Sequence, residues 1–255
     1  WLATSGFSDF AGSTLVHACG GAAALAGVIV LGAREGRFGK RGEKRSMQPF
    51  AASSIPLVTL GTFLLWFGWF GFNGFSQLAM GTFDDVNAIS KIAVNTHLAG
   101  AAGTVTGAAL TRLIGGKTDI VMMLNGALAG LVAITAEPLT PGPITAMVIG
   151  SIGAVIMYYG TKLLENLGLD DVVGAIPVHM FAGIFGTLVV PLTNADTSFG
   201  TQLIGVISVC VFSFVLSWIT FSTLKSTVGL RISRAAERQG TDKAEVGVIA
   251  YSIRD

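Results

Sequence analysis

Two segments of the chain share a spaced pattern that places one histidine inside each of two apolar stretches. The pattern reads D-x2-G-x3-V-H-x3-G, and its members are Asp9, Gly12, Val16, His17 and Gly21 in the first segment and Asp171, Gly174, Val178, His179 and Gly183 in the second. Ionisable side chains inside hydrocarbon are costly and usually mark a transport path or a ligand site. Two neutral imidazoles in contact can share a proton, because one ring nitrogen donates while the other accepts. The pattern therefore predicts an internal duplication whose two histidines accept a proton or hydrogen-bond a small polar solute.

The composition indicates the class of protein in which these histidines work. Hydrophobic residues make up 51% of the chain and charged residues 12%, and the mean hydropathy is +0.68, whereas soluble domains carry about 25% charged residues. The net charge of +1 gives no basis for a nucleic-acid partner. Two histidines alone do not fill a tetrahedral metal site, and the sequence shows no nucleophile triad or phosphate loop. We therefore expect a membrane protein that is not an enzyme and has no cofactor or bound metal.

Seven apolar segments reach or approach the length of about 20 residues that a membrane-spanning helix needs. We predict an all-α polytopic fold with a transmembrane domain over 1–224 and a tail over 225–255. The predicted spans are 9–33, 50–73, 90–113, 119–137, 143–164, 172–192 and 200–224. If the spans alternate in direction, every Lys and Arg except Lys91 falls on one side of the membrane. The positive-inside rule makes that side cytoplasmic, so the C-terminus is expected in the cytoplasm of a multi-pass cell-membrane protein.

This topology makes the two histidine-bearing spans antiparallel. Asp9 then lies at the external end of the first span, and Asp171 lies at the cytoplasmic end of the sixth. Each histidine follows its aspartate by eight residues, which places it roughly 12 Å into the membrane from its own face. Such opposed repeats have their functional site near the midplane, so His17 and His179 are expected to be in contact. Asp170 and Asp171 are expected to cap the second helix, and the third histidine, His97, is expected to be structural.

Several longer stretches resemble one known family. They are DFAGSTLVH, GWFGFNGFS, VNTHLAGAAG and DDVVGAIPVHMFAGIFGTL, together with LGAREGRFGK, EPLTPG and GLRIS. The chain strongly resembles the ammonium transporter (Amt/Mep/Rh) family up to about residue 233. The resemblance implies an inverted-repeat fold of eleven spans, of which this sequence is similar to spans five to eleven, with the N-terminal spans absent from it. It also implies a homotrimer.

The resemblance assigns roles to individual residues. His17 and His179 would be the twin histidines that line a hydrophobic pore, and Asp9 would be the carboxylate near the external recruitment site. Phe72 would belong to the gate above the pore, and the hydroxyl of Ser76 would help to bind ammonium. An aromatic vestibule attracts a cation, while an apolar pore rejects it because desolvation is costly. The implied function is therefore ammonium transport by recruitment, deprotonation and passage of ammonia.

Two departures from the family pattern keep a second function open. Phe75 stands where the family usually has a small residue. The tail, with Thr241 and Val246, lacks the usual acidic, histidine-containing ending, and a tail of this kind also fits a linker into a signalling domain. The alternative is an ammonium-sensing module fused to such a domain, which binds ammonium with little or no conduction. The resemblance further implies that a PII-type regulator can dock near the basic loop 34–45.

Overall fold

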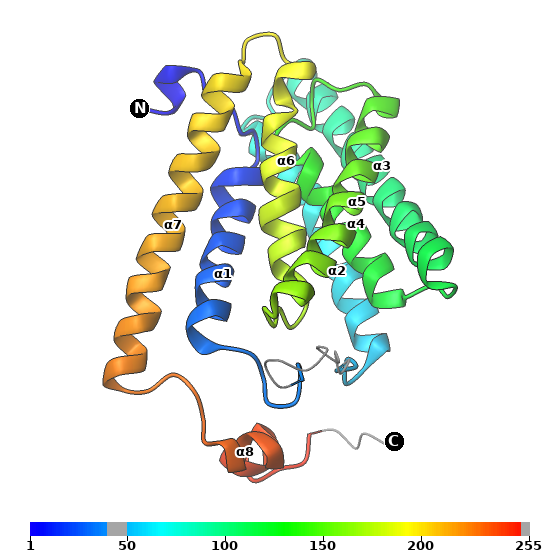
Figure 1. Cartoon of the computed structure of the whole chain (residues 1–255). Helices are drawn as coiled ribbons and strands as arrows, with labels where there is room; N and C mark the ends of the chain where they lie inside the picture. Colours follow the sequence, from blue (N-terminus) through cyan, green and yellow to red (C-terminus); the bar gives the residue numbers. More distant parts are fainter. Residues whose placement is uncertain (40–49, 251–255) are drawn as a thin grey trace.

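The protein is an all-helical bundle in the part of the chain that the structure, a computed structural model, describes, namely residues 1–39 and 50–250. The long helices run side by side between two ends of the molecule (Figure 1). The helical elements are η1 (Ala3–Ser5), η2 (Ser13–Ala18), α1 (Cys19–Leu31), α2 (Ile55–Gly74), η3 (Phe75–Gln77), α3 (Phe83–Gly115), α4 (Ile120–Ile134), α5 (Pro143–Leu167), η4 (Ile176–Phe181), α6 (Ala182–Leu188), η5 (Val190–Leu192), α7 (Phe199–Thr227), α8 (Arg234–Gln239) and η6 (Asp242–Val246).

Each predicted span has a helical counterpart, and the bounds differ most at α3. Four apolar helical segments are long enough to cross a membrane, and they are Ser13–Leu31, Ile55–Gln77, Pro143–Leu167 and Phe199–Thr227. Helix α3 begins at Phe83 rather than at residue 90. The Thr82 side chain accepts the backbone N–H of Asp85, and the Asp85 carboxylate accepts the backbone N–H of Thr82. This reciprocal cap starts the helix in polar sequence that a search for apolar runs passes over.

The two histidine-bearing segments lie antiparallel near the middle of the bundle. In Figure 1 the segment η2–α1 runs downward from the N-terminal end, and the segment η4–α6 runs upward beside it. In the second segment Pro177 lies in the first turn of η4, and Pro191 lies in the 3₁₀ turn η5, where the regular helix has ended. Prolines remove backbone donors and break regular helices. Helix α4 packs against both segments and is buried along most of its length from Leu124 onward.

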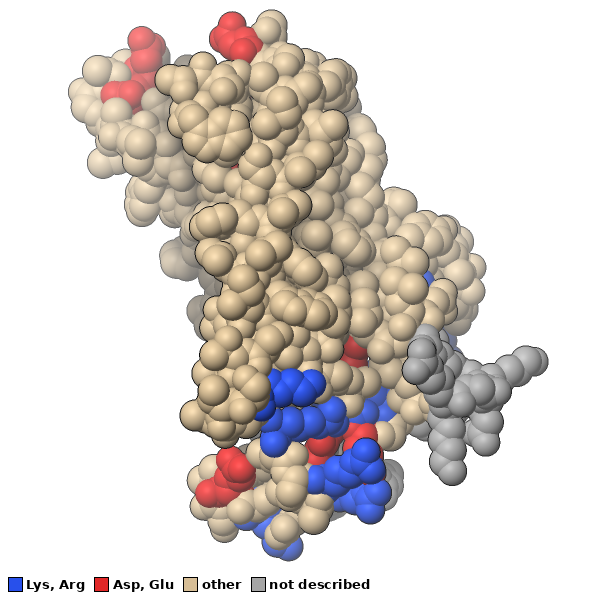
Figure 2. Space-filling model, turned by 60° about the vertical axis from the view of Figure 1, so that its left-hand side comes forward, with Lys and Arg blue, Asp and Glu red and all other residues tan. Residues whose placement is uncertain are grey.

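Lys and Arg side chains gather at the end of the bundle that carries α8 (Figure 2), where several acidic side chains lie among them. There the Arg34 guanidinium donates to both carboxylate oxygens of Asp170, at 2.8 Å each, and Arg37 lies 3.0 Å from Glu165. Burial acts to raise the pKa of Asp170, but the hydrogen bonds and charge of Arg34 outweigh it and the pKa is lowered. Asp170 therefore binds arginine instead of capping the helix, which corrects the prediction from sequence. The basic residues between 40 and 49 and Arg254 lie outside the described residues.

Candidate functional site

The aspartate of each repeated pattern caps the helix that carries the histidine. Asp9 accepts the backbone N–H of Thr14 at 2.9 Å and that of Leu15 at 2.8 Å. Asp171 accepts the N–H of Ile176 at 2.7 Å, and also the N–H groups of Gly174 and Ala175. Thr14 and Ile176 both follow their aspartate by five residues, so the two caps share this bond. Each satisfies backbone donors that a helix start leaves without partners.

The first glycine of each pattern has a backbone conformation that other residues rarely adopt. Gly12 has a φ of 108° and Gly174 a φ of 79°. A Cβ atom is strained at such positive φ values, and glycine avoids this strain. The chain therefore turns sharply after each aspartate and directs the backbone N–H groups of the next turn back toward the carboxylate.

The second glycine of each pattern lies where the two repeats cross. A Cβ atom on Gly21 would lie 2.6 Å from the backbone nitrogen of Met180, which belongs to the second repeat. A Cβ atom on Gly183 would lie 2.3 Å from the carbonyl oxygen of Ser13, which belongs to the first repeat. The backbones thus approach more closely than any larger residue would allow, as small residues permit between membrane helices. The reciprocal contacts hold the two histidine-bearing turns together.

The crossing brings His17 and His179 into direct contact, as predicted. The two Nδ1 atoms lie 3.2 Å apart, and the ring centroids are 5.2 Å apart with an angle of 20° between the planes. A hydrogen bond at this distance requires one Nδ1 to donate and the other to accept. The Nε2 atom of His17 is buried, and no atom of the described residues forms a hydrogen bond with it. The pair therefore has a ring nitrogen that no described residue engages.

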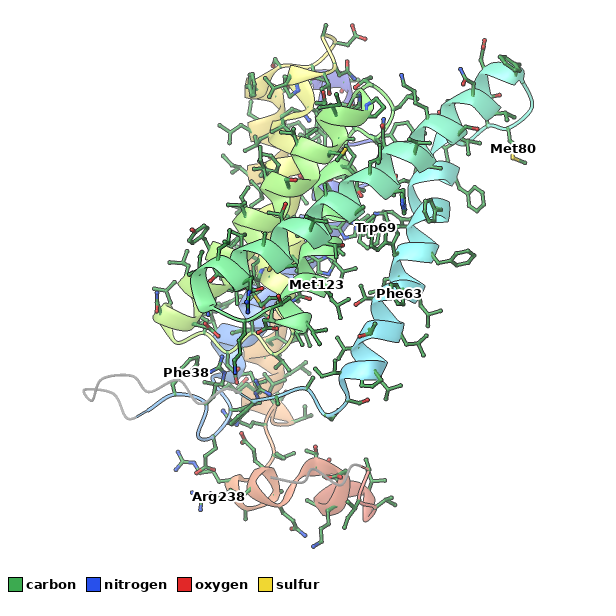
Figure 3. The ribbon with its side chains drawn as sticks, turned by 90° about the vertical axis from the view of Figure 1, so that its right-hand side faces the viewer. Phe38, Phe63, Trp69, Met80, Met123 and Arg238 are labelled. Carbon is green, nitrogen blue, oxygen red and sulfur yellow. The ribbon has the colours of Figure 1, made fainter. Side chains whose placement is uncertain are left out.

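Two aromatic rings of α2 cover His17. Trp69 stacks on the imidazole with centroids 5.0 Å apart and planes 17° apart, and Phe72 lies at 5.5 Å. Trp69 is 5% exposed, and Figure 3 shows it directed from α2 toward the other helices. Its indole N–H donates to the Thr135 hydroxyl at 2.9 Å. The sequence did not single out Trp69, because it stands among six aromatic residues and only its tertiary contacts distinguish it.

The remaining predicted site residues lie toward the same end of the bundle as the start of η2. Ser76 lies in η3, one turn beyond Phe72, and its hydroxyl donates to the Phe72 carbonyl oxygen at 2.8 Å. One carboxylate oxygen of Asp9, Oδ1, is buried and has no hydrogen-bond partner within the described part of the chain.

His97 lies apart from the pair, near the side chains of Trp66 and Phe70. The ring of Phe75 lies over Gly71 and is largely exposed.

Residues 1–251 match the model of the Ammonium Transporter Family. The chain belongs to this family. It is 41% identical to the Archaeoglobus fulgidus protein named ammonium transporter Amt2, over 98% of this chain and 58% of that protein. It is 39% identical to the putative ammonium transporter sll1017 of Synechocystis, over 97% of this chain and 56% of that protein.

Solved structures of the family have the same fold. A structure described as a sensor Amt protein superposes with a TM-score of 0.88 at 35% identity, over 96% of this chain and 62% of that one. Mep2 from Candida albicans superposes with a TM-score of 0.78 at 29% identity, over 91% of this chain and 54% of that one. The family and the fold class predicted from sequence are thus confirmed. The chain spans less than two thirds of the length of these relatives.

Proposed function

We propose that the protein transports ammonium by recruiting the cation, removing one proton and passing neutral ammonia along the two histidines. The single observation that carries this proposal is the part-buried contact between His17 and His179, whose Nδ1 atoms lie 3.2 Å apart, with two aromatic rings packed against His17. Histidines at this depth in an apolar bundle are costly unless they act on a solute. Curated relatives named ammonium transporters make ammonium the expected solute.

Recruitment requires groups that favour a small cation. The unpartnered Oδ1 atom of Asp9 supplies negative charge near the mouth of the first repeat. The Ser76 hydroxyl gives its proton to the Phe72 carbonyl, which leaves the lone pairs of its oxygen to accept an N–H group. The face of Phe72, which is 39% exposed, adds cation–π attraction, and Phe72 acts as the gate because its ring lies beside His17.

Passage beyond the gate favours the neutral form of the solute. A bare cation loses its hydration in an apolar pore, at a large cost in free energy. Ammonium avoids this cost by losing a proton and crossing as neutral ammonia. In the deprotonation step an N–H bond of ammonium breaks, the proton goes to a neutral imidazole nitrogen, and ammonia leaves. Because the His17 and His179 rings share a hydrogen bond, the pair relays the proton by exchanging donor and acceptor roles.

The assembly and orientation are part of the same proposal. The gathering of Lys and Arg at the end that carries α8 supports a cytoplasmic C-terminus. The family resemblance supports a homotrimer with one pore in each subunit, and a PII-type regulator or a fused signalling domain as partners on the cytoplasmic side. The regulator would then dock near the basic loop 34–45, and the tail beyond α7 would lead into the signalling domain.

The deciding experiment measures tracer uptake and current in liposomes that contain the complete protein. We expect ammonium-dependent transport in the unaltered protein and its loss in His17→Ala and His179→Ala variants that remain folded. The structural likeness to a sensor Amt protein makes sensing the second candidate. Ammonium binding without measurable uptake or current would favour the sensor, and full transport by both histidine variants would overturn the proposed mechanism.

A further inference from the structure

We propose that Gln202 is a positioning residue that fixes the carboxylate of Asp9 at the mouth of the first repeat. This inference rests on the proposed role of Asp9 in ammonium recruitment. Gln202 lies in the first turns of α7, far from the aspartate in sequence, and its side chain is completely buried. A buried amide is costly unless its donors and acceptor are satisfied.

Gln202 satisfies its amide on the residue that directly precedes Asp9. Its Oε1 atom accepts the backbone N–H of Ser8 at 2.9 Å, and its Nε2 atom donates to the Ser8 carbonyl at 2.6 Å. The side-chain amide thus binds both the N–H and the carbonyl group of Ser8, as a residue of a neighbouring β-strand would. The peptide groups on both sides of Ser8 are therefore fixed. The position of the next residue along the chain, Asp9, is thereby restricted.

The second Nε2 proton of Gln202 binds a residue of α6 in the second repeat. It is donated to the carbonyl oxygen of Thr187 at 3.0 Å. The hydroxyl groups of Thr187 and Thr14 are hydrogen-bonded at 2.7 Å, and the backbone N–H of Thr14 binds Asp9. Gln202 therefore holds the Asp9 loop directly through Ser8 and indirectly through Thr187 and Thr14.

Gly205, one turn further along α7, adds a steric constraint on the segment that precedes Asp9. A Cβ atom on Gly205 would lie 2.1 Å from the ring of Phe7. The backbone segment 7–9 is thus pressed against α7 at Gly205 and hydrogen-bonded to α7 at Gln202. Two backbone N–H groups hold the Asp9 carboxylate through Oδ2. No hydrogen bond from the described residues holds Oδ1, so its place depends on those two bonds together with the support of the backbone by α7.

The test compares the complete protein with a Gln202→Met variant in liposomes. Methionine is similar in length and removes all three hydrogen bonds. We expect the ammonium concentration for half-maximal transport to rise by about tenfold or more, since small misplacements of a binding group cost up to about a hundredfold. A merely structural role would lower the amount of folded protein and the maximal rate, and would leave the half-maximal concentration unchanged.

Ser213→Ala is the matched control. Ser213 lies on the same helix, is 8% exposed and donates to the Cys19 carbonyl at 2.8 Å, so the control also removes a buried hydrogen bond of α7 without touching the Asp9 loop. We expect an unaltered half-maximal concentration. If Gln202→Met does not fold, Gln202→Glu keeps the acceptor for Ser8 and is expected to raise the concentration in the same direction.

An Asp9→Asn variant separates this inference from the function on which it rests. If Asp9→Asn leaves transport unchanged, the recruitment role of Asp9 is wrong. If Asp9→Asn raises the half-maximal concentration or abolishes transport while folded Gln202 variants match the unaltered protein, only the positioning role of Gln202 is overturned.

Discussion

Asp9 and Asp171 hold equivalent places in two antiparallel helices, but only Asp171 has both carboxylate oxygens engaged. Oδ1 of Asp171 accepts two backbone N–H groups, and Oδ2 accepts a third. Asp9 accepts its N–H bonds with Oδ2, and its buried Oδ1 has no hydrogen-bond partner in residues 1–39 and 50–250. The duplicated cap is therefore complete in one repeat and leaves a free acceptor in the other, at the end where recruitment is proposed.

Asparagine substitutions are expected to separate these two aspartates. Asp9→Asn keeps one acceptor oxygen for Thr14 and Leu15, so we expect nearly unaltered stability but a loss of ammonium transport. Asp171→Asn turns one of its two engaged oxygens into an N–H donor that faces backbone N–H groups. We expect this change to cost about 1 kcal/mol or more of unfolding free energy. Thermal unfolding in detergent and tracer uptake measure the two effects.

The opposite pattern would contradict the assignment. Asp9→Asn would then unfold at a lower temperature than Asp171→Asn, and it would transport ammonium as well as the unaltered protein. Such a result would reduce Asp9 to a helix cap. Asp9→Ala, which removes the cap as well as the charge, is expected to lose about 1 kcal/mol of stability in addition to transport.

The two histidines are expected to behave as one unit. We expect His17→Ala and His179→Ala each to abolish transport. The stability change of the double variant is expected to differ from the sum of the two single changes by a coupling energy of about 0.5–3 kcal/mol. The physical reason is the hydrogen bond between the two Nδ1 atoms. A complete double-mutant cycle of unfolding free energies measures the coupling.

His97→Ala is the control for the histidine cycle. Its ring lies against Trp66 and Phe70, away from the pair. We expect transport to persist in this variant and its coupling to His17 to be close to zero. A coupling energy between His17 and His179 that is also zero would mean that their contact does not stabilise the protein.

The sequence predicted the part of the site that repeats. The two aspartate–histidine patterns, with the charge distribution of the loops, were enough to expect an antiparallel crossing and the contact of His17 with His179. The resemblance supplied Phe72, Ser76 and the role of Asp9, which remain predictions about function. The repeated pattern predicts the contact because the same local structure, a capping aspartate followed by a glycine turn and a histidine, occurs in both segments.

The parts that the sequence missed depend on contacts between distant residues. Trp69 differs from its aromatic neighbours only by stacking on His17 and by its bond to Thr135. Asp170 stands next to a capping residue, and its choice of Arg34 as partner is visible only in the folded chain. Hydropathy also misses the polar start of α3, since a reciprocal cap begins a helix without apolar residues.

The ion pair of Asp170 with Arg34 is expected to make stability depend on pH. Because the folded-state pKa of Asp170 is lowered, its contribution is complete above the ordinary aspartate pKa of about 3.9 and is lost as the pH falls through the lower folded value. We expect Asp170→Asn to cost about 1–3 kcal/mol at pH 7. Unfolding measured at pH 7, 5 and 3 should show the difference between the variant and the unaltered protein shrink only at the lowest pH.

A constant difference across these pH values would mean that the charge of Asp170 is not the source of the effect. The matched control is Asp196→Asn, which alters an exposed loop carboxylate. Its backbone N–H binds the side chain of Asn194, and a change of its own side chain is expected to shift the unfolding free energy by less than about 0.5 kcal/mol.

Two adjacent glycines of α1, Gly20 and Gly21, differ in how closely they approach the second repeat. A Cβ atom on Gly21 would lie 2.6 Å from both the nitrogen and the Cβ atom of Met180, whereas a Cβ atom on Gly20 would have no neighbour within 4 Å. Gly21→Ala must push α1 away from η4, so we expect a loss of about 1–3 kcal/mol from overpacking together with a loss of transport. Gly20→Ala should be neutral or stabilise α1 by up to about 1 kcal/mol, because alanine favours helix. Unfolding and uptake measured on both variants test the crossing directly. Equal behaviour of the two variants would mean that the close approach at Gly21 does not hold the histidine pair together.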